Sequence, residues 1–255
     1  MKDLSNLELK NFLDEKVFEF NTKSFIADDP IQIPHQFKNK EDIEIAAFLV
    51  CTIAWGNRKS IIDNSYKMMS LLDESPFDFV MNHSEKELTP LRKFVHRTFN
   101  GNDFVFFIQS LKTIYKHKNG LEQIFKTHQT ENSLSESIVN FHHIFFEPVH
   151  EKRTEKHVAN PSKGSVAKRI NLFLRWMVRK DGIVDFGLWD ISPSKLSCPL
   201  DVHSGNIARK LGLINRKNND LPALSELDSN LRTFDKEDPV KYDYALFGLG
   251  AYDKF

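Results

Sequence analysis

The sequence is poor in cysteine, glycine and proline. Its two cysteines, Cys51 and Cys198, form no metal-spaced pair. This excludes a four-cysteine iron–sulfur cluster held by this chain alone, and it favours a reducing compartment. Glycine and proline number only 10 each in 255 residues, which suits packed helices better than a β-protein with many turns.

Net charge and long apolar runs are also missing. The 35 basic residues balance the 35 acidic ones, so overall charge does not mark the chain as a nucleic-acid binder. No run approaches the length of a membrane span, and the polar start of the sequence has no apolar signal core. We therefore expect a soluble cytoplasmic protein with no membrane contact.

Apolar residues recur at helical spacing along most of the sequence. The nearly unbroken apolar run from Ile43 to Thr52 is too long for an ordinary strand and predicts a buried helix. A break at Trp55-Gly56-Asn57-Arg58 separates it from a second helix that begins at Ser60. Further helices are expected over residues 103–115, 134–146 and 166–178. The pattern predicts an all-α fold over residues 1–255.

One part of the chain is strongly basic. Residues 151–180 hold nine lysines and arginines against two glutamates. Such a run of charged residues usually forms a solvent-exposed surface. Here it also contains the turn-rich stretch Asn160-Pro161-Ser162-Lys163-Gly164, which enters a helix whose free amide groups could hold a phosphate. A local basic face on a neutral protein favours binding to the phosphate backbone of nucleic acid.

The segment Pro199-Leu200-Asp201-Val202-His203 precedes another amphipathic helix. Asp201 is placed to cap that helix, which would be a purely structural role. The same Pro-x-Asp-x-His run resembles the catalytic-aspartate segment of the helix-hairpin-helix DNA glycosylase superfamily, whose best-known members are similar to endonuclease III. Asp201 matches the carboxylate that serves glycosidic-bond cleavage in those enzymes.

The resemblance spans roughly residues 40–250. The helix break with Asn57 and Arg58 is similar to the region that places polar residues against DNA. Pro161-Ser162-Lys163-Gly164 resembles a degraded hairpin in which Ser162 replaces the first expected glycine. The wide separation of lysine and aspartate is most similar to the archaeal 8-oxoguanine glycosylases. The segments Arg-Trp-Met-Val-Arg and Pro-Leu-Asp-x-His also fit a family of bacterial proteins of unassigned function.

The resemblance implies two interleaved helical lobes with a DNA-binding cleft between them. It implies a monomeric DNA glycosylase that removes a damaged purine in base excision repair, with or without lyase activity, and needs neither cofactor nor metal. Lys168 is the expected nucleophile, with Arg169 and Arg175 as cationic neighbours. The strict hairpin register departs from this assignment, because it puts Val166 at the lysine position. Arg169 stays protonated and cannot attack, so Lys163 is the rival nucleophile.

Eight residues are the implied contacts to double-stranded DNA with a damaged base: Trp55, Asn57, Arg58, Lys163, Gly164, Arg169, His203 and Arg209. Trp55 is the expected stacking residue, since enzymes that extrude a base grip it with aromatic faces. Two other functions stay open. The chain could be a non-catalytic nucleic-acid-binding protein on the same scaffold, or a helical interaction protein that binds no nucleic acid.

Overall fold

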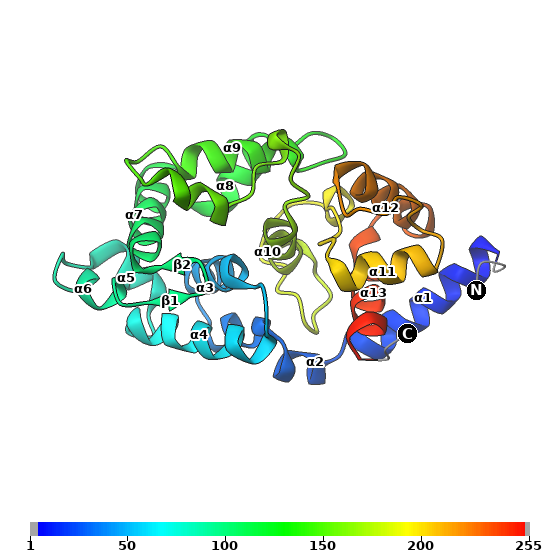
Figure 1. Ribbon diagram of the computed structural model, residues 1–255, viewed down its shortest axis with the longest axis horizontal. Coiled ribbons are helices and arrows are strands. Elements are labelled where there is room, and N and C mark those ends of the chain that lie inside the picture. The colour runs from blue at the N-terminus through cyan, green and yellow to red at the C-terminus, as the bar shows by residue number, and fades with distance from the viewer. Residues whose placement is uncertain (1–4, 253–255) are drawn as a thin grey trace. The chain divides into compact units, whose positions relative to one another are not determined.

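The computed structural model describes residues 5–252, and these form an almost entirely helical structure (Figure 1). The all-α prediction is confirmed. The strands found in this range, β1 (Val95–His96) and β2 (Phe99–Asn100), pair antiparallel as a short hairpin. No helix in residues 5–252 is both long and apolar enough to cross a lipid bilayer.

The chain divides into two compact units, each assembled from separate stretches of sequence. Unit 1 comprises the residues through Phe25, a short piece at 130–134 and everything from Asn160 onward. Unit 2 comprises residues 26–129 and 135–159. Helix α2 (Lys23–Asp28) contains the first boundary.

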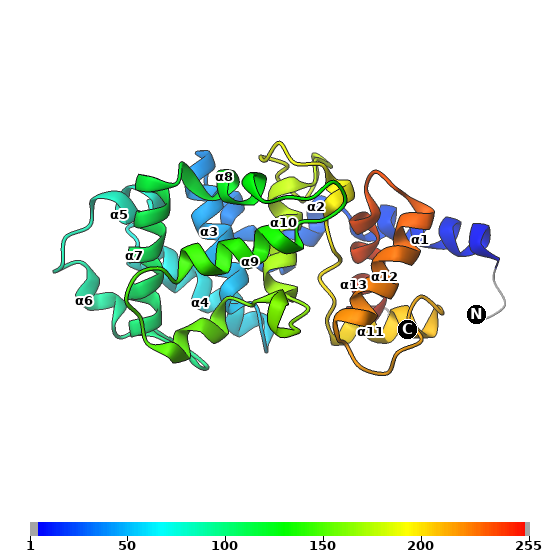
Figure 2. The ribbon, with the colours of Figure 1, turned by 90° about the horizontal axis from the view of Figure 1, so that it is seen from above.

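Unit 2 is built mainly from helices (Figure 2), and it holds the strand hairpin labelled in Figure 1. Besides β1 and β2, its elements are η1 (Pro30–Gln32), η2 (Pro34–Gln36), α3 (Lys40–Ile53), α4 (Arg58–Leu71), α5 (Pro76–Asn82), α6 (Leu88–Leu91), α7 (Gly101–His117), α8 (Gly120–Thr127), α9 (Ser135–Phe145) and η3 (Lys152–His157).

Phenylalanine fills the core of unit 2. Every residue of α3 from Ile43 to Ile53 is buried, as the apolar run predicts. The ring of Phe48 stacks on Phe107 at 5.7 Å between centroids and meets Phe141 edge-on at 5.4 Å. Offset and edge-to-face aromatic pairs of this kind add to the free energy gained by burial. The high phenylalanine content is therefore used largely for packing.

Unit 1 contains the helices that carry the predicted catalytic residues. Its elements are α1 (Asn6–Phe20), η4 (Pro161–Lys163), α10 (Lys168–Val178), η5 (Pro193–Lys195), α11 (Val202–Lys210), α12 (Leu221–Phe234), η6 (Pro239–Lys241) and α13 (Tyr242–Ala251). Helix α13 packs against both α1 and α11. Its apolar side chains, including Leu246 and Leu249, join Leu13, Ile207 and Leu227 in one buried core.

The predicted hairpin before α10 has a different form from the one expected. Its first arm is the single 3₁₀ turn η4, because Asn160 caps it, Pro161 opens it and Gly164 (φ 86°) ends it after three residues. Ala167 is also left-handed (φ 47°) and delays the start of α10 to Lys168. Lys168 therefore opens the helix, two residues later than the predicted start at residue 166, and the two preceding residues belong to the turn.

Candidate active site

The fold brings Lys168 and Asp201 together within unit 1. Lys168 lies in the first turn of α10, and Asp201 directly precedes α11. The Lys168 Nζ atom is 3.5 Å from Asp201 Oδ2, and the two side chains are 29% and 20% exposed. This distance is that of an ion pair and is longer than a good hydrogen bond. Partial exposure leaves both groups accessible to a ligand.

Asp201 uses its two carboxylate oxygens differently. Oδ1 caps α11 by accepting a hydrogen bond from the backbone N–H of Ser204 at 3.0 Å, and the Ser204 hydroxyl accepts one from the Asp201 N–H at 2.9 Å. Oδ2 faces Lys168. The structural cap and the pairing with lysine therefore coexist, and the cap fixes the direction in which the second oxygen points.

A buried carboxylate, Asp243, lies within electrostatic range of this pair. Burial raises its pKa and the charge of Asp201 raises it further, whereas the charges of Arg175 and Lys168 lower it. The Arg175 guanidinium donates a hydrogen bond to Asp243 and also lies 3.3 Å from Asp185. Arg175, which is expected to be a cationic neighbour of Lys168, is thus itself paired with two carboxylates.

Arg179, one helical turn after Arg175, is also buried among carboxylates. It pairs with Asp185 at 2.6 Å, with Asp238 at 2.9 Å and with Asp181 at 3.0 Å. Arg175 and Arg179 are each 3% exposed, so neither belongs to a solvent-facing basic surface. The predicted basic face is smaller than the nine charges in the sequence suggest.

Sequence reasoning misses Asp243 and the buried character of the two arginines. The sequence contains a feature that indicates each of them. Arg175 and Arg179 flank the apolar stretch Trp176-Met177-Val178, and Asp243 lies between two tyrosines at the start of an apolar helix. Arginine and aspartate are almost never fully buried unless they are paired. Such charges in apolar helices therefore indicate buried ion pairs.

Two buried acids also surround Cys198, which lies three residues before Asp201. The Cys198 thiol contacts Asp243 Oδ1 at 3.6 Å, and its N–H donates to Asp228 Oδ1 at 2.9 Å. Burial raises the pKa of this thiol well above its ordinary value, and the charges of Asp243 and Asp228 raise it further. Cys198 is thus an unreactive thiol that helps to hold the segment leading to Asp201.

Asp228→Asn is expected to change how stability depends on pH. Burial raises the pKa of Asp228 from 3.8 to about 6. Between these values the folded protein keeps a proton that the unfolded chain has lost, so wild-type stability falls as the pH rises. A pKa rise of about two corresponds to about 3 kcal/mol. The free energy of unfolding of the variant, relative to that of wild type, should therefore rise by about this amount between pH 4 and pH 7. Urea unfolding at the two pH values measures it. An unchanged difference would contradict the assignment.

His203 and the last helix form an aromatic surface next to Asp201. His203 is exposed in the first turn of α11, and its ring lies 6.2 Å from that of Phe247 in α13. Tyr252 meets Phe247 edge-on at 6.4 Å and is 41% exposed. Helix α11 packs on α13, so the last helix lies beside the Asp201 segment.

The other residues predicted to contact DNA in unit 1 differ from one another in exposure and in their contacts. Lys163 and Gly164 are exposed in the turn before α10, and a Cβ atom at Gly164 would meet no neighbour within 4 Å. Arg169 is half-buried. Arg209 is half-buried too, and its guanidinium donates to Asn219 Oδ1 and to the carbonyl of Arg216. Arg209 therefore has a structural role that the sequence did not suggest.

The predicted contacts in unit 2 lie at the break between α3 and α4. Asn57 caps α4 by accepting a hydrogen bond from the Ser60 N–H at 3.0 Å. Trp55 is half-buried, and its ring meets those of the buried His96 and His157 at 5.2 and 6.0 Å. The segment predicted to contact DNA, residues 55–58, is thus exposed at Asn57, while Trp55 packs against two buried histidines.

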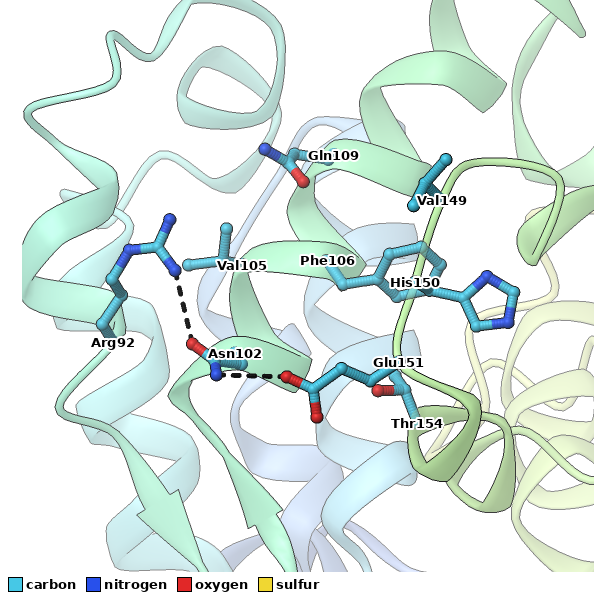
Figure 3. Close-up of a pocket in the computed structure, with 9 residues that line it drawn as sticks. All are labelled: Arg92, Asn102, Val105, Phe106, Gln109, Val149, His150, Glu151 and Thr154. Carbon is cyan, nitrogen blue, oxygen red and sulfur yellow. Dashed lines mark hydrogen bonds between the residues drawn. The ribbon is translucent and has the colours of Figure 1, made fainter.

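Unit 2 also contains an open pocket, and none of the predicted site residues lines it (Figure 3). Its volume is about 260 Å³, and the side chains of Arg92, Asn102 and Glu151 form a hydrogen-bonded chain along one wall. Phe106 contributes apolar surface. Within residues 5–252, no three metal-binding side chains gather into a possible ion site.

A family model described as a protein of unknown function (DUF2400) matches residues 29–252. The chain belongs to this family. Membership of a family without an assigned function is thereby confirmed as predicted. Comparisons with curated proteins and with solved structures find no match. The family match covers unit 2 from Asp29 onward and unit 1 from Asn160 to the last described residue, including the Lys168–Asp201 pair.

Proposed function

We propose that this DUF2400 chain is a DNA glycosylase that removes a damaged purine from duplex DNA. The observation that carries the proposal is the 3.5 Å approach of Lys168 Nζ to Asp201 Oδ2. An amine and a carboxylate at one partly exposed point are the two groups that lysine-dependent glycosidic cleavage requires. The resemblance of the Asp201 segment to the glycosylase superfamily supports DNA as the substrate and a damaged purine as the base.

Lys168 and Asp201 have separate roles in the proposed reaction. The Lys168 amine, after losing a proton, attacks C1′ of the damaged nucleotide. The bond from C1′ to the base breaks, and the base leaves with the electron pair and takes up a proton. The Asp201 carboxylate accepts the proton that Lys168 loses and passes it on to the departing base. Ionised again, it stabilises the positive charge that develops on the sugar. Opening of the sugar ring then gives an imine between C1′ and Lys168.

Trapping by borohydride tests this proposal. Borohydride reduces the imine to an amine and leaves a permanent protein–DNA crosslink. The wild-type protein is incubated with a panel of duplexes that each carry one damaged base, with and without borohydride. Base release together with a crosslink on at least one duplex supports the proposal. Binding without release or crosslink on every duplex would instead favour a non-catalytic nucleic-acid-binding protein.

Affinity for undamaged duplex is expected to fall as salt rises, with little preference for sequence. Phosphate contacts from exposed lysines such as Lys163 release counterions, and salt opposes that release. Because Arg175 and Arg179 are buried, the number of contacts is smaller than the sequence suggests. We expect a loss of about tenfold or more between about 50 and 200 mM salt, measured by fluorescence anisotropy. Failure to bind duplex even at low salt would favour a helical interaction protein.

The double variant Asn57→Ser/Arg58→Gln is expected to weaken binding to lesion-bearing duplex. An enzyme that extrudes a base must brace the gap in the stack, and the loop at the start of α4 is the proposed brace. Serine keeps the helix cap that Asn57 provides, so the melting temperature should stay close to that of wild type. By contrast, Asn57→Ala should lose about 1 kcal/mol of stability through the cap alone. Unchanged lesion affinity in the double variant would contradict the assignment.

A further inference from the structure

We infer that Asn219 is a positioning residue for Asp201, an inference that rests on the proposed function. Asn219 lies half-buried in the loop between α11 and α12. Its Nδ2 donates a hydrogen bond to the backbone carbonyl of Asp201 at 2.6 Å. The same carbonyl accepts the first helical hydrogen bond of α11, from the Gly205 N–H at 2.9 Å. Asn219 thus holds the backbone of the residue whose carboxylate faces Lys168.

The other end of the Asn219 amide is held by Arg209. The Arg209 guanidinium donates to Asn219 Oδ1, and its Nε donates to the carbonyl of Arg216 at 2.6 Å. Arg216 in turn pairs with Asp220 at 2.7 Å, and Asp220 caps α12. Because donor and acceptor of the amide are both engaged, its orientation is fixed from two sides.

Gly205 provides the space for this contact. A Cβ atom at position 205 would lie 2.5 Å from Asn219 Oδ1 and 2.9 Å from Asn219 Nδ2. Glycine weakens a helix relative to alanine, so the close approach of Asn219 gives a physical reason for glycine inside α11. A side chain at position 205 would have to displace the Asn219 amide.

These contacts fix Asp201 at three points. Its N–H is bonded to Ser204 Oγ, its carbonyl to Asn219 and its Oδ1 to the Ser204 N–H. Only Oδ2 remains directed at Lys168. Displacements of about 1 Å in a reacting group can cost about 100-fold in rate, so loss of the Asn219 bond should slow the reaction without weakening DNA binding.

The test compares Asn219→Ala with Asn230→Ala on a duplex that the wild-type protein cleaves. Asn230 is the matched control, because its Nδ2 donates a similar bond to the Leu213 carbonyl at 2.8 Å in the same unit. We expect Asn219→Ala to lower the single-turnover rate of base release about tenfold while leaving duplex affinity unchanged. Asn230→Ala should keep the wild-type rate, although both variants lose one hydrogen bond.

Gly205→Ala is a second variant that keeps every polar group. It should raise helix propensity yet lower the single-turnover rate, because the new methyl group displaces Asn219. A wild-type rate in Asn219→Ala, or equal losses in Asn219→Ala and Asn230→Ala, would overturn this inference alone. Absence of base release and crosslinking in the wild-type protein would overturn the proposed function and this inference together.

Discussion

Lys168→Gln is expected to abolish the borohydride-trapped crosslink while keeping most of the affinity for duplex DNA. The imine that borohydride reduces forms from the side-chain amine of lysine, and glutamine has no amine. Binding should survive because the change removes a single charge from a surface that contacts several phosphates. The measurement is a denaturing gel of the crosslink beside an anisotropy titration. Lys163→Gln is the matched control, since Lys163 is an exposed lysine in the turn just before α10.

The same experiment separates the roles of the two lysines and of Asp201. A crosslink that persists in Lys168→Gln and disappears in Lys163→Gln would transfer the nucleophile to Lys163. Asp201→Asn should bind DNA at least as well as wild type, because a negative charge near phosphate is removed, and it should react far more slowly. Asparagine is also a good helix cap, so this variant should stay folded. Asp201→Ala should additionally lose about 1 kcal/mol of stability.

The helices were largely predictable from sequence because apolar periodicity and helix breakers are local signals. The run from Ile43 to Thr52 predicted α3, and the break at Trp55–Arg58 predicted the boundary with α4. The turn before α10 was harder to predict. Its shape depends on left-handed backbone at Gly164 and Ala167. Alanine rarely adopts that conformation, so its presence in the sequence does not predict it.

The candidate site was predictable only in part. The resemblance to the glycosylase superfamily singled out Asp201 and Lys168, and their side chains approach to 3.5 Å in the structure. The partners of Asp201 were not found, because Asn219 and Gly205 reach each other through folding of a loop that leaves no periodic signal. The contacts of Arg209 with Asn219 and Arg216 were not predicted either. In the sequence, an arginine that faces phosphate cannot be told from one that bonds to a neighbouring loop.

Arg175→Met is expected to cause the largest loss of stability among the variants considered. Arg175 is buried and bonded to Asp243 and Asp185, so its removal takes away the ion-pair partner of the buried Asp243, whereas Asp185 keeps Arg179. Breaking a buried ion pair from one side typically costs about 3–5 kcal/mol. Urea unfolding at pH 7 measures the loss, and Arg216→Met, which breaks an exposed pair with Asp220, is the control that should change stability little.

The double variant Arg175→Met/Asp243→Asn shows whether the loss comes from the uncompensated charge. Removing both partners eliminates the buried carboxylate, so the double variant should be more stable than Arg175→Met alone. Lower pH should have the same effect on the single variant. Burial raises the pKa of Asp243 even with Arg175 present, and without Arg175 the carboxyl binds a proton more readily. The deficit of Arg175→Met should therefore shrink as the pH falls. A deficit that is constant with pH, and equal in the single and double variants, would show that Arg175 stabilises unit 1 through packing and not through its charge.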